Sequence, residues 1–384
     1  MPTRAVIAHI SDLHFGNHDE DVARYLRADL LRETKPDFIV VTGDLSELKS
    51  ASQFDKAKDF LGGIVSALSD EHRSARAIVI PGNHDVGIFK GRKAWDDAFR
   101  AWKVGGIKGV CQPGKLVDFY TKDSKGDPST AERRSEDDWS YCEYYPECQL
   151  AFLKFDSNKI APTLWNKLSL PWVYRNYARG RIGGEQLAEM IAVLDRYKNA
   201  FPPGKKEPAF QDARKIALVH HHIHYLPNVG SDSIFLMLDA GPFWRTMIDL
   251  GVELVLHGHK HYATHAVIRY MSQIEGGREE RELMVLSAGT AASKDRPDGN
   301  SYYRLEADML SCRVRKRKNT DVRFEDDGPA IVFRVPAGTP QFIDGWNVVC
   351  PIIESVAALG SGVLCHYHEL LPMRTASAPA DKTG

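Results

Sequence analysis

Residues 77–85 read AIVIPGNHD and are the most informative stretch of the chain. The apolar residues predict a short buried strand, and Gly82-Asn83-His84-Asp85 follows at its carboxyl end. Four other segments repeat this arrangement, in which an apolar run precedes carboxylate or imidazole side chains. They are Asp12-Leu13-His14, Gly43-Asp44, His220-His221-His222 and Gly258-His259-Lys260-His261. Because parallel strands of an open α/β sheet end at one crevice, we expect all five segments to converge there.

Short apolar runs alternate with amphipathic stretches, which predicts an α/β layered core. The expected strands are Ala5–Ile10, Phe38–Thr42, Ala77–Ile80, Ala151–Phe155, Ile216–Val219, Leu254–Leu256 and Leu283–Ser287. The expected helices are Asp19–Glu33, Ala51–Leu68, Gly184–Tyr197 and Phe243–Leu250. Alternation after Ser301, in Tyr303–Glu306 and Cys312–Arg317, indicates antiparallel or edge strands.

Residues 87–150 interrupt this pattern inside a catalytic domain that we expect to span residues 1–310. They are rich in aromatic and polar residues and low in strand signal. Two interpretations remain open: a cap that overhangs the site, or a surface insertion packed through Trp95, Phe99 and Trp102.

Residues 311–384 are expected to form a C-terminal extension, with a disordered tail at 375–384. Within it, Ile331–Val335 and Val348–Ile353 fit either an edge strand over the core or a dimer interface. The sequence therefore leaves the oligomeric state open.

Composition excludes some functional classes. The 384 residues carry a net charge of −1 with 26% charged residues, so overall charge does not favour nucleic acid or an anionic membrane. No stretch approaches the roughly 20 apolar residues of a membrane span. The first motif begins too early for a cleavable signal to precede it, and the six cysteines are scattered as in reduced proteins. We expect a cytoplasmic protein.

The spacing of the polar residues indicates metal binding. Asp12 and His14 are two positions apart at a strand end, so their side chains point to one side and can share an ion. His259 and His261 repeat this spacing. Carboxylate, amide and imidazole donors suit manganese, iron, zinc or nickel.

Three further residues complete the expected chemistry. Asp44 is the natural bridging ligand, because a carboxylate can give one oxygen to each of two cations. Asn83 offers a neutral carbonyl oxygen. His84 points away from its chain neighbour and suits a general acid for a leaving oxygen.

Together these segments resemble the signature blocks of the calcineurin-like metallophosphoesterase superfamily. The resemblance covers the chain to about Ala307 and implies a four-layer α/β/β/α sandwich with two mixed sheets. It also implies two divalent metal ions between the loops of the sheets. One ion would be held by Asp12, His14, Asp44 and His261. The other would be held by Asp44, Asn83, one histidine of the 220–222 run, and His259.

The resemblance leaves open which histidine of that run is the ligand. Relatives usually carry a proline shortly after it, and matching Ile223 to that proline favours His221, with His220 as second choice. His222 would then face the substrate or occupy a solvated loop position.

The implied reaction is in-line attack on phosphorus by a hydroxide that bridges the two ions. His84 would protonate the departing alkoxide. Asp85 would orient an imidazole or the turn.

Motif details select the substrate class. Ser/Thr protein phosphatases of this superfamily carry Asp-Arg-Gly after the second block, and Gly43–Glu47 lacks it. They also end the third block in Glu, where this chain has Asp85. The segment Ser11–Gly16 and the Gly-Asp-Leu-Ser block look most like bacterial cyclic-nucleotide phosphodiesterases, and Asp156-Ser157 matches a further family pattern. We therefore expect a phosphodiesterase for a small diester such as a cyclic nucleotide.

Three alternatives remain. A phosphomonoesterase would use the same metal centre. A DNA or RNA nuclease of the superfamily would contact phosphates through the basic run and stack bases on the aromatic residues of the insertion. The basic run comprises Arg313, Arg315, Lys316, Arg317 and Lys318. These cations are better explained as a solvent-facing strand balanced by Glu325–Asp327. The third alternative, a non-catalytic scaffold, has no reason to keep every ligand position.

Overall fold

The fold is seen in a computed structural model, which describes most of the catalytic region. The described residues are 5–48, 50–69, 75–86, 95, 98–99, 141–145, 148–158, 179–198, 213–224, 236–274, 277–294, 299–307, 311–318, 320–332 and 366–368. None of the helices among them is long and apolar enough to cross a membrane.

Two mixed sheets form the centre of the molecule, and each has seven strands within the described part. The first follows the order β12-β11-β10-β1-β2-β3, with β13 paired to β11. Its strands are β1 (Val6–Ile10), β2 (Phe38–Val41), β3 (Arg76–Val79), β10 (Asn300–Glu306), β11 (Ser311–Arg317), β12 (Glu325–Asp326) and β13 (Ile331–Val332). β1, β2 and β3 run parallel to one another, and β10 returns antiparallel to β1.

The second sheet follows the order β14-β8-β9-β7-β6-β5-β4. Its strands are β4 (Tyr141–Tyr145), β5 (Leu150–Lys154), β6 (Arg214–Leu218), β7 (Val252–His257), β8 (Thr264–Ile274), β9 (Gly277–Ser287) and β14 (His366–His368). β5, β6, β7 and β9 are parallel neighbours. The carboxyl ends of these strands and of β1 to β3 carry the polar motifs.

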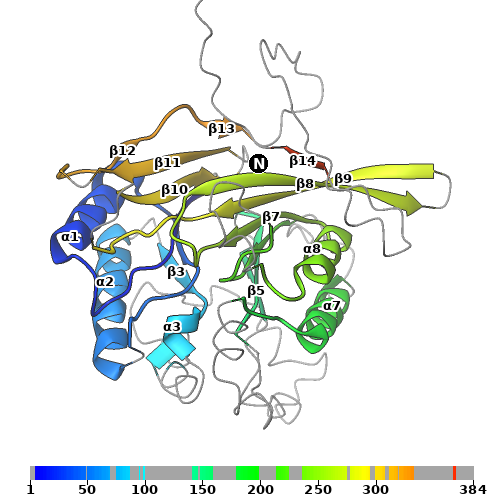
Figure 1. Ribbon diagram of the computed structural model, residues 1–384, viewed down its shortest axis with the longest axis horizontal. Helices are drawn as coiled ribbons and strands as arrows, with labels where there is room; N and C mark the ends of the chain where they lie inside the picture. Colours follow the sequence, from blue (N-terminus) through cyan, green and yellow to red (C-terminus); the bar gives the residue numbers. More distant parts are fainter. Residues whose placement is uncertain are drawn as a thin grey trace, which may run out of the picture.

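Helices cover the outer face of each sheet (Figure 1). The described helices are α1 (Glu20–Asp29), which continues into a π-helical turn at Leu30–Thr34, α2 (Ala51–Leu68), α3 (Asn83–Val86), α7 (Gly184–Lys198) and α8 (Ala240–Asp249). Asp19 caps α1, because its side chain accepts hydrogen bonds from the backbone N–H groups of Asp21 and Val22.

Three apolar clusters separate these layers. One contains Leu26 and Leu61, by which α1 and α2 pack on the first sheet. Another contains Phe243, by which α8 packs on the second sheet. The central cluster lies between the sheets and includes Val40 and Phe152. The expected four-layer α/β/β/α sandwich is therefore confirmed.

Of the long hairpin formed by β8 and β9, only the second half of β9, at Leu283–Ser287, was expected. β4 was not expected. β4 lies inside the region interpreted as low in strand signal, so that interpretation is wrong at Tyr141–Tyr145. The sequence YCEYY has strong strand propensity, but charged, turn-prone residues precede it and obscured the signal. β11 pairs with β10 along its length, so the first sheet continues beyond residue 310.

The start of the insertion is anchored in the core. Trp95 and Phe99 are fully buried and stack on each other, and both meet the ring of Phe54 on α2. Trp102, most of residues 87–140 and the proposed tail at 375–384 lie outside the described residues. The same is true of Val348–Ile353.

Candidate metal centre

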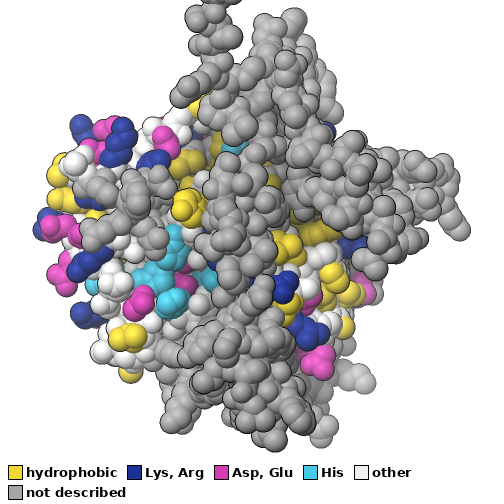
Figure 2. Space-filling view, in the orientation of Figure 1, with side chains coloured by type: hydrophobic (Ala, Val, Ile, Leu, Met, Phe, Trp, Pro, Cys, Tyr) yellow, Lys and Arg dark blue, Asp and Glu magenta, His cyan; other side chains and the backbone are white. Residues whose placement is uncertain are grey.

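The loops after β1, β2, β3, β6 and β7 converge at one place between the sheets. Within the described part of the chain, three groups each bring three ligand atoms within 4.8 Å of one another. The groups are Asp12-His14-His261, His14-Glu47-His84 and Asp44-His220-His259. Figure 2 shows histidine and acidic side chains gathered on one exposed face of the molecule.

The first group has the geometry of a metal site. Asp12 Oδ1 lies 3.1 Å from His261 Nε2, and His14 Nε2 lies 3.3 Å from His261 Nε2. Atoms bound to one ion at about 2.0–2.2 Å lie roughly 3 Å from each other, so these separations fit. Asp12 Oδ1 is also buried without a hydrogen-bond partner among the described residues. A cation would satisfy this oxygen.

The third group, Asp44-His220-His259, gives a sharper indication. His220 Nδ1 donates to the carbonyl of Thr42 at 2.7 Å, which leaves Nε2 as the nitrogen with a free lone pair. That Nε2 faces Asn83 Oδ1 at 2.9 Å and Asp44 Oδ2 at 3.3 Å. His259 Nδ1 also lies 2.9 Å from Asn83 Oδ1. Acceptor atoms that face one another at such distances are satisfied by a shared cation, so these residues fit a metal ion.

The electrostatics lead to the same inference. Burial alone would lower the pKa of His220, but the carboxylates of Asp44 and Asp12 raise it to about 9. Burial alone would raise the pKa values of Asp12 and Asp44, yet the surrounding imidazoles hold both below the usual range. The centre therefore attracts positive charge, which divalent metal ions would supply more effectively than protons.

The histidine run is arranged differently from our expectation. His220, not His221, faces Asp44 and Asn83. His221 turns to Ser157, whose Oγ lies 2.7 Å from His221 Nδ1. The preference for His221 relied on a proline that this chain lacks, and these contacts favour His220 as the ligand instead.

His222 also departs from expectation. Its side chain is only 4% exposed, so it is neither in a solvated loop position nor at the substrate surface. Its ring lies beside His224 and His257, with centroids 6.5 and 4.9 Å away.

Sequence analysis missed Glu47. Its Oε2 lies 2.8 Å from His14 Nδ1, so the carboxylate faces the ring nitrogen opposite the proposed metal-binding Nε2. Its Oε1 lies 3.8 Å from His84 Nδ1. An acidic residue three positions after Asp44 was visible in the sequence, but only the structure shows that the loop turns it back to the site.

His84 lies at the open edge of the centre. Its side chain is 39% exposed, and its backbone N–H donates to Asp44 Oδ1 at 2.8 Å. His84 Nδ1 lies 3.3 Å from the carbonyl of Glu47 and can donate to it. That bond leaves Nε2 to exchange a proton with a bound molecule.

Asp85 supports the turn: within the described residues, its carboxylate accepts hydrogen bonds from backbone N–H groups and the Ser46 hydroxyl rather than from an imidazole. Its buried carboxylate accepts from the backbone N–H groups of Leu45, Ser46 and Gly82 at 3.2, 2.8 and 2.9 Å. Burial and the charge of Asp44 raise its pKa to about 6, despite these bonds. Asp85 thus ties the loop that carries Asp44 to the loop that carries Asn83.

The ligand backbone is strained. Of the described non-glycine residues with a left-handed φ, five are proposed ligands: Asp12, His14, Asp44, His259 and His261. Such conformations cost about 1–3 kcal/mol each and persist where surrounding structure enforces them. Gly82 is required for a related reason, since a Cβ there would lie 2.1 Å from Asp44 Oδ1.

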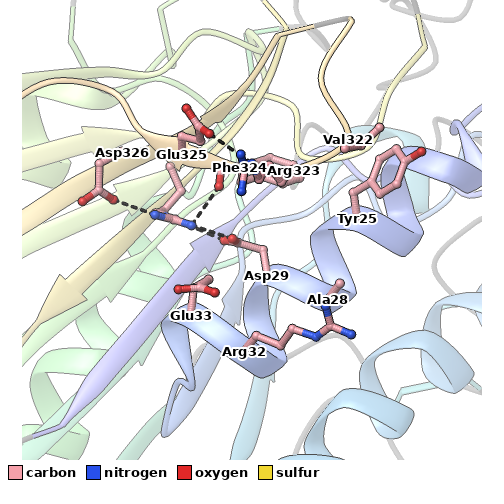
Figure 3. Close-up of a pocket in the computed structure, with 11 residues that line it drawn as sticks. Tyr25, Ala28, Asp29, Arg32, Glu33, Val322, Arg323, Phe324, Glu325 and Asp326 are labelled. Atoms are coloured by element: carbon pink, nitrogen blue, oxygen red, sulfur yellow. Dashed lines mark hydrogen bonds and ion pairs between the residues drawn. The ribbon is translucent and has the colours of Figure 1, made fainter.

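A separate groove of about 470 Å³ lies between α1 and the β11–β12 region (Figure 3). Its charges largely neutralise one another: Arg315 pairs with Asp29 and, at 2.8 Å, with Asp326. Lys316 lies 3.6 Å from Asp327. These pairs support a locally balanced strand for this part of the basic run, whereas the expectation that the strand is solvated is wrong at Arg315 and Arg317, whose side chains are mostly buried.

A protein-family model identifies the chain. The model for calcineurin-like phosphoesterases matches residues 5–263, which include every proposed ligand. The chain belongs to this family. Among curated proteins, none matches the sequence significantly.

Several solved structures are similar to this chain at low identity. A purple acid phosphatase, PPD1, from yellow lupin is 13% identical with a TM-score of 0.48, over 85% of this chain and 53% of that one. This chain thus spans about half the length of the lupin protein. PhoD is 10% identical with a TM-score of 0.45, over 85% and 68%. GAP50, the anchor in the inner membrane complex of Plasmodium, is 12% identical with a TM-score of 0.43, over 84% and 88%. The family and the metal-ligating groups together support a metal-dependent phosphoester hydrolase.

Proposed function

We propose that this protein is a phosphodiesterase that uses two divalent metal ions to hydrolyse a small diester, such as a cyclic nucleotide. The observation that carries the proposal is the pair of adjacent ligand groups, joined where the backbone N–H of His259 donates to Asp12 Oδ2 at 3.0 Å. Asp12, His14 and His261 would hold one ion. Asp44 would bridge to the second, held by Asn83, His220 and His259.

Two metal ions would neutralise charge on the phosphate and lower the pKa of the attacking water. The chain's own residues position the other participants. Glu47 fixes the ring of His14, and the Thr42 carbonyl fixes the ring of His220. His84, with Nδ1 directed to the Glu47 carbonyl, would give its Nε2 proton to the leaving oxygen.

Charge at the edge of the site favours a diester over a monoester. The loop after Asp44 presents the Glu47 carboxylate and the exposed Leu48. Neither residue can bind a phosphate dianion as an arginine in this loop would. A diester carries one negative charge near neutral pH and a monoester carries nearly two, so Glu47 repels the monoester more strongly.

The test compares hydrolysis of bis-p-nitrophenyl phosphate and p-nitrophenyl phosphate with added manganese. Wild type is expected to prefer the diester, and Asp44→Ala is expected to lose at least 100-fold in turnover, about 2.7 kcal/mol. Asp55→Ala is the matched control, because Asp55 is exposed and forms a local ion pair with Lys58. Preference for the monoester would indicate a phosphatase. No turnover together with no bound metal would refute the proposal and favour a scaffold.

A nuclease uses the same centre but needs cations for the nucleic-acid backbone. The ion pairs of Arg315 and Lys316 weaken that case. If the diester is cleaved, cyclic nucleotides are the next substrates to test, and single-stranded DNA follows as the control for the nuclease.

A further inference from the structure

Gln53, in the first turn of α2, joins two loops beside the open edge of the metal centre, although it is not one of the proposed metal ligands. Its side-chain Oε1 accepts a hydrogen bond from the backbone N–H of Leu48 at 2.8 Å. The amide also lies against Gly16, where a Cβ would be 2.0 Å from Gln53 Nε2 and 2.6 Å from Cδ. One side chain therefore contacts both the loop after His14 and the loop after Asp44.

The start of the helix fixes the place of Gln53. Ser50 is the N-cap of α2, and its Oγ accepts from the backbone N–H of Gln53 at 3.3 Å. The next residue, Phe54, is fully buried in the core. Gly16 has a left-handed φ of 111° and no Cβ, which leaves room for the Gln53 amide. The side chain thus extends from an anchored part of the helix.

The hydrogen bond to Leu48 reaches His84 through one peptide plane. The Glu47 carbonyl and the Leu48 N–H belong to the same planar group, and in a trans peptide they point in opposite directions. On one side, Gln53 holds the N–H at 2.8 Å. On the other side, the carbonyl oxygen lies 3.3 Å from His84 Nδ1. Gln53 therefore sets the direction of the oxygen that orients the His84 ring.

The same contact restrains the Glu47 carboxylate. The N–H of Glu47 donates to the Phe15 carbonyl at 3.1 Å, which holds the peptide before Glu47, and Gln53 holds the peptide after it. Because both peptides are held, the Glu47 side chain leaves the backbone in one direction, toward His14 Nδ1 at 2.8 Å. Gln53 thus supports both contacts that Glu47 makes with the centre.

We propose that Gln53 is a positioning residue for proton transfer by His84, an inference that rests on the phosphodiesterase function proposed above. Gln53 does not touch the substrate. It holds the Glu47 carbonyl beside His84 Nδ1, so that Nε2 faces the leaving oxygen. A general acid contributes about 10²–10⁴-fold to a rate, and it does so only when its donor atom is correctly placed.

The leaving group reveals this role. p-Nitrophenoxide is a weak base and departs with little help, whereas phenoxide is a stronger base and depends more on a proton from His84. Loss of the Gln53 contact should therefore slow hydrolysis of diphenyl phosphate more than that of bis-p-nitrophenyl phosphate. A general loosening of the fold would slow both reactions to the same extent.

The experiment measures kcat and KM for both diesters at saturating manganese. Gln53→Met keeps an unbranched side chain of similar length and removes the amide. It is expected to lose about tenfold in kcat on diphenyl phosphate and less than about threefold on bis-p-nitrophenyl phosphate, with little change in KM. Gln53→Glu keeps an acceptor for the Leu48 N–H and should restore kcat on diphenyl phosphate. Asp59→Met is the matched control, because Asp59 is exposed on the same helix and should equal wild type.

The outcomes separate this inference from the proposed function. Equal losses on the two diesters, no loss on either, or no recovery in Gln53→Glu would overturn the role of Gln53 and leave the phosphodiesterase in place. If wild type cleaves neither diester, the proposed function fails and this inference fails with it. Thermal unfolding checks that the variants fold. If Gln53→Met does not, Gln53→Ala also lacks the acceptor, suits a helix and allows the same comparison.

Discussion

Replacement of Glu47 by glutamine tests how the metal centre is supported. The substitution keeps the size of the side chain and removes the charge that lies 2.8 Å from His14 Nδ1. A hydrogen bond to a charged group contributes about 1.5–3 kcal/mol, and the 28% exposure of Glu47 places the expected loss near 1.5 kcal/mol. Such a loss weakens metal binding about tenfold, at the lower end of the range for residues that orient ligands.

The assay measures diester hydrolysis against manganese concentration. Glu47→Gln is expected to raise the half-saturating concentration about tenfold and to reduce turnover at saturating metal, because the Glu47 carboxylate also lies 3.8 Å from His84 Nδ1. Asp21→Asn is the control, since Asp21 is exposed and forms a local ion pair with Arg24. If both the half-saturating concentration and the turnover of Glu47→Gln stay within twofold of wild type, Glu47 does not orient His14.

Three other predictions follow from single contacts. His220→Asn should lose metal and at least 100-fold in turnover, whereas His221→Asn should retain metal; the reverse result would restore the assignment from sequence. Burial lowers the pKa of His9 to about 3, so its imidazole binds a proton more readily in the unfolded chain, and His9 should account for about 2 kcal/mol of the stability that the metal-free protein loses from pH 6.5 to 5. Urea unfolding in chelator should show this loss, and His9→Gln should reduce it. Gly258→Ala should destabilise by about 1–3 kcal/mol, because its Cβ would lie 1.8 Å from a neighbouring side-chain oxygen, whereas Gly184→Ala meets nothing within 4 Å and should be neutral in thermal unfolding.

Local sequence was sufficient for the strands and helices that carry the motifs. α2 spans Ala51–Leu68 as expected, and α1 begins one residue after its Asp19 cap. These elements have strong periodicity and clear caps, so local preferences agree with the fold. All of β8 and the first half of β9 were missed because pairing within the hairpin, not their own residues, determines that they are strands. β4 was missed because the charged, turn-prone residues before it obscured its own strand propensity.

The sequence by itself determined which kinds of metal-ligand side chains are present and that the motifs converge at one place. Carboxylate, amide and imidazole residues follow parallel strands, and such strands end at one crevice whatever the details of the loops. The family followed from the same motifs, which a match over residues 5–263 confirms.

Only the tertiary structure decided which side chains face the proposed ions. His220 and His221 are chemically identical neighbours, and the Thr42 carbonyl and Ser157 hydroxyl, distant in sequence, set their directions. Contacts between loops also determine the left-handed backbone at ligands such as Asp12. They likewise direct the Glu47 side chain towards His14. The sequence carries little information about these side-chain directions. They depend on a few backbone and side-chain dihedral angles at each strand end, and packing across the two sheets fixes those angles.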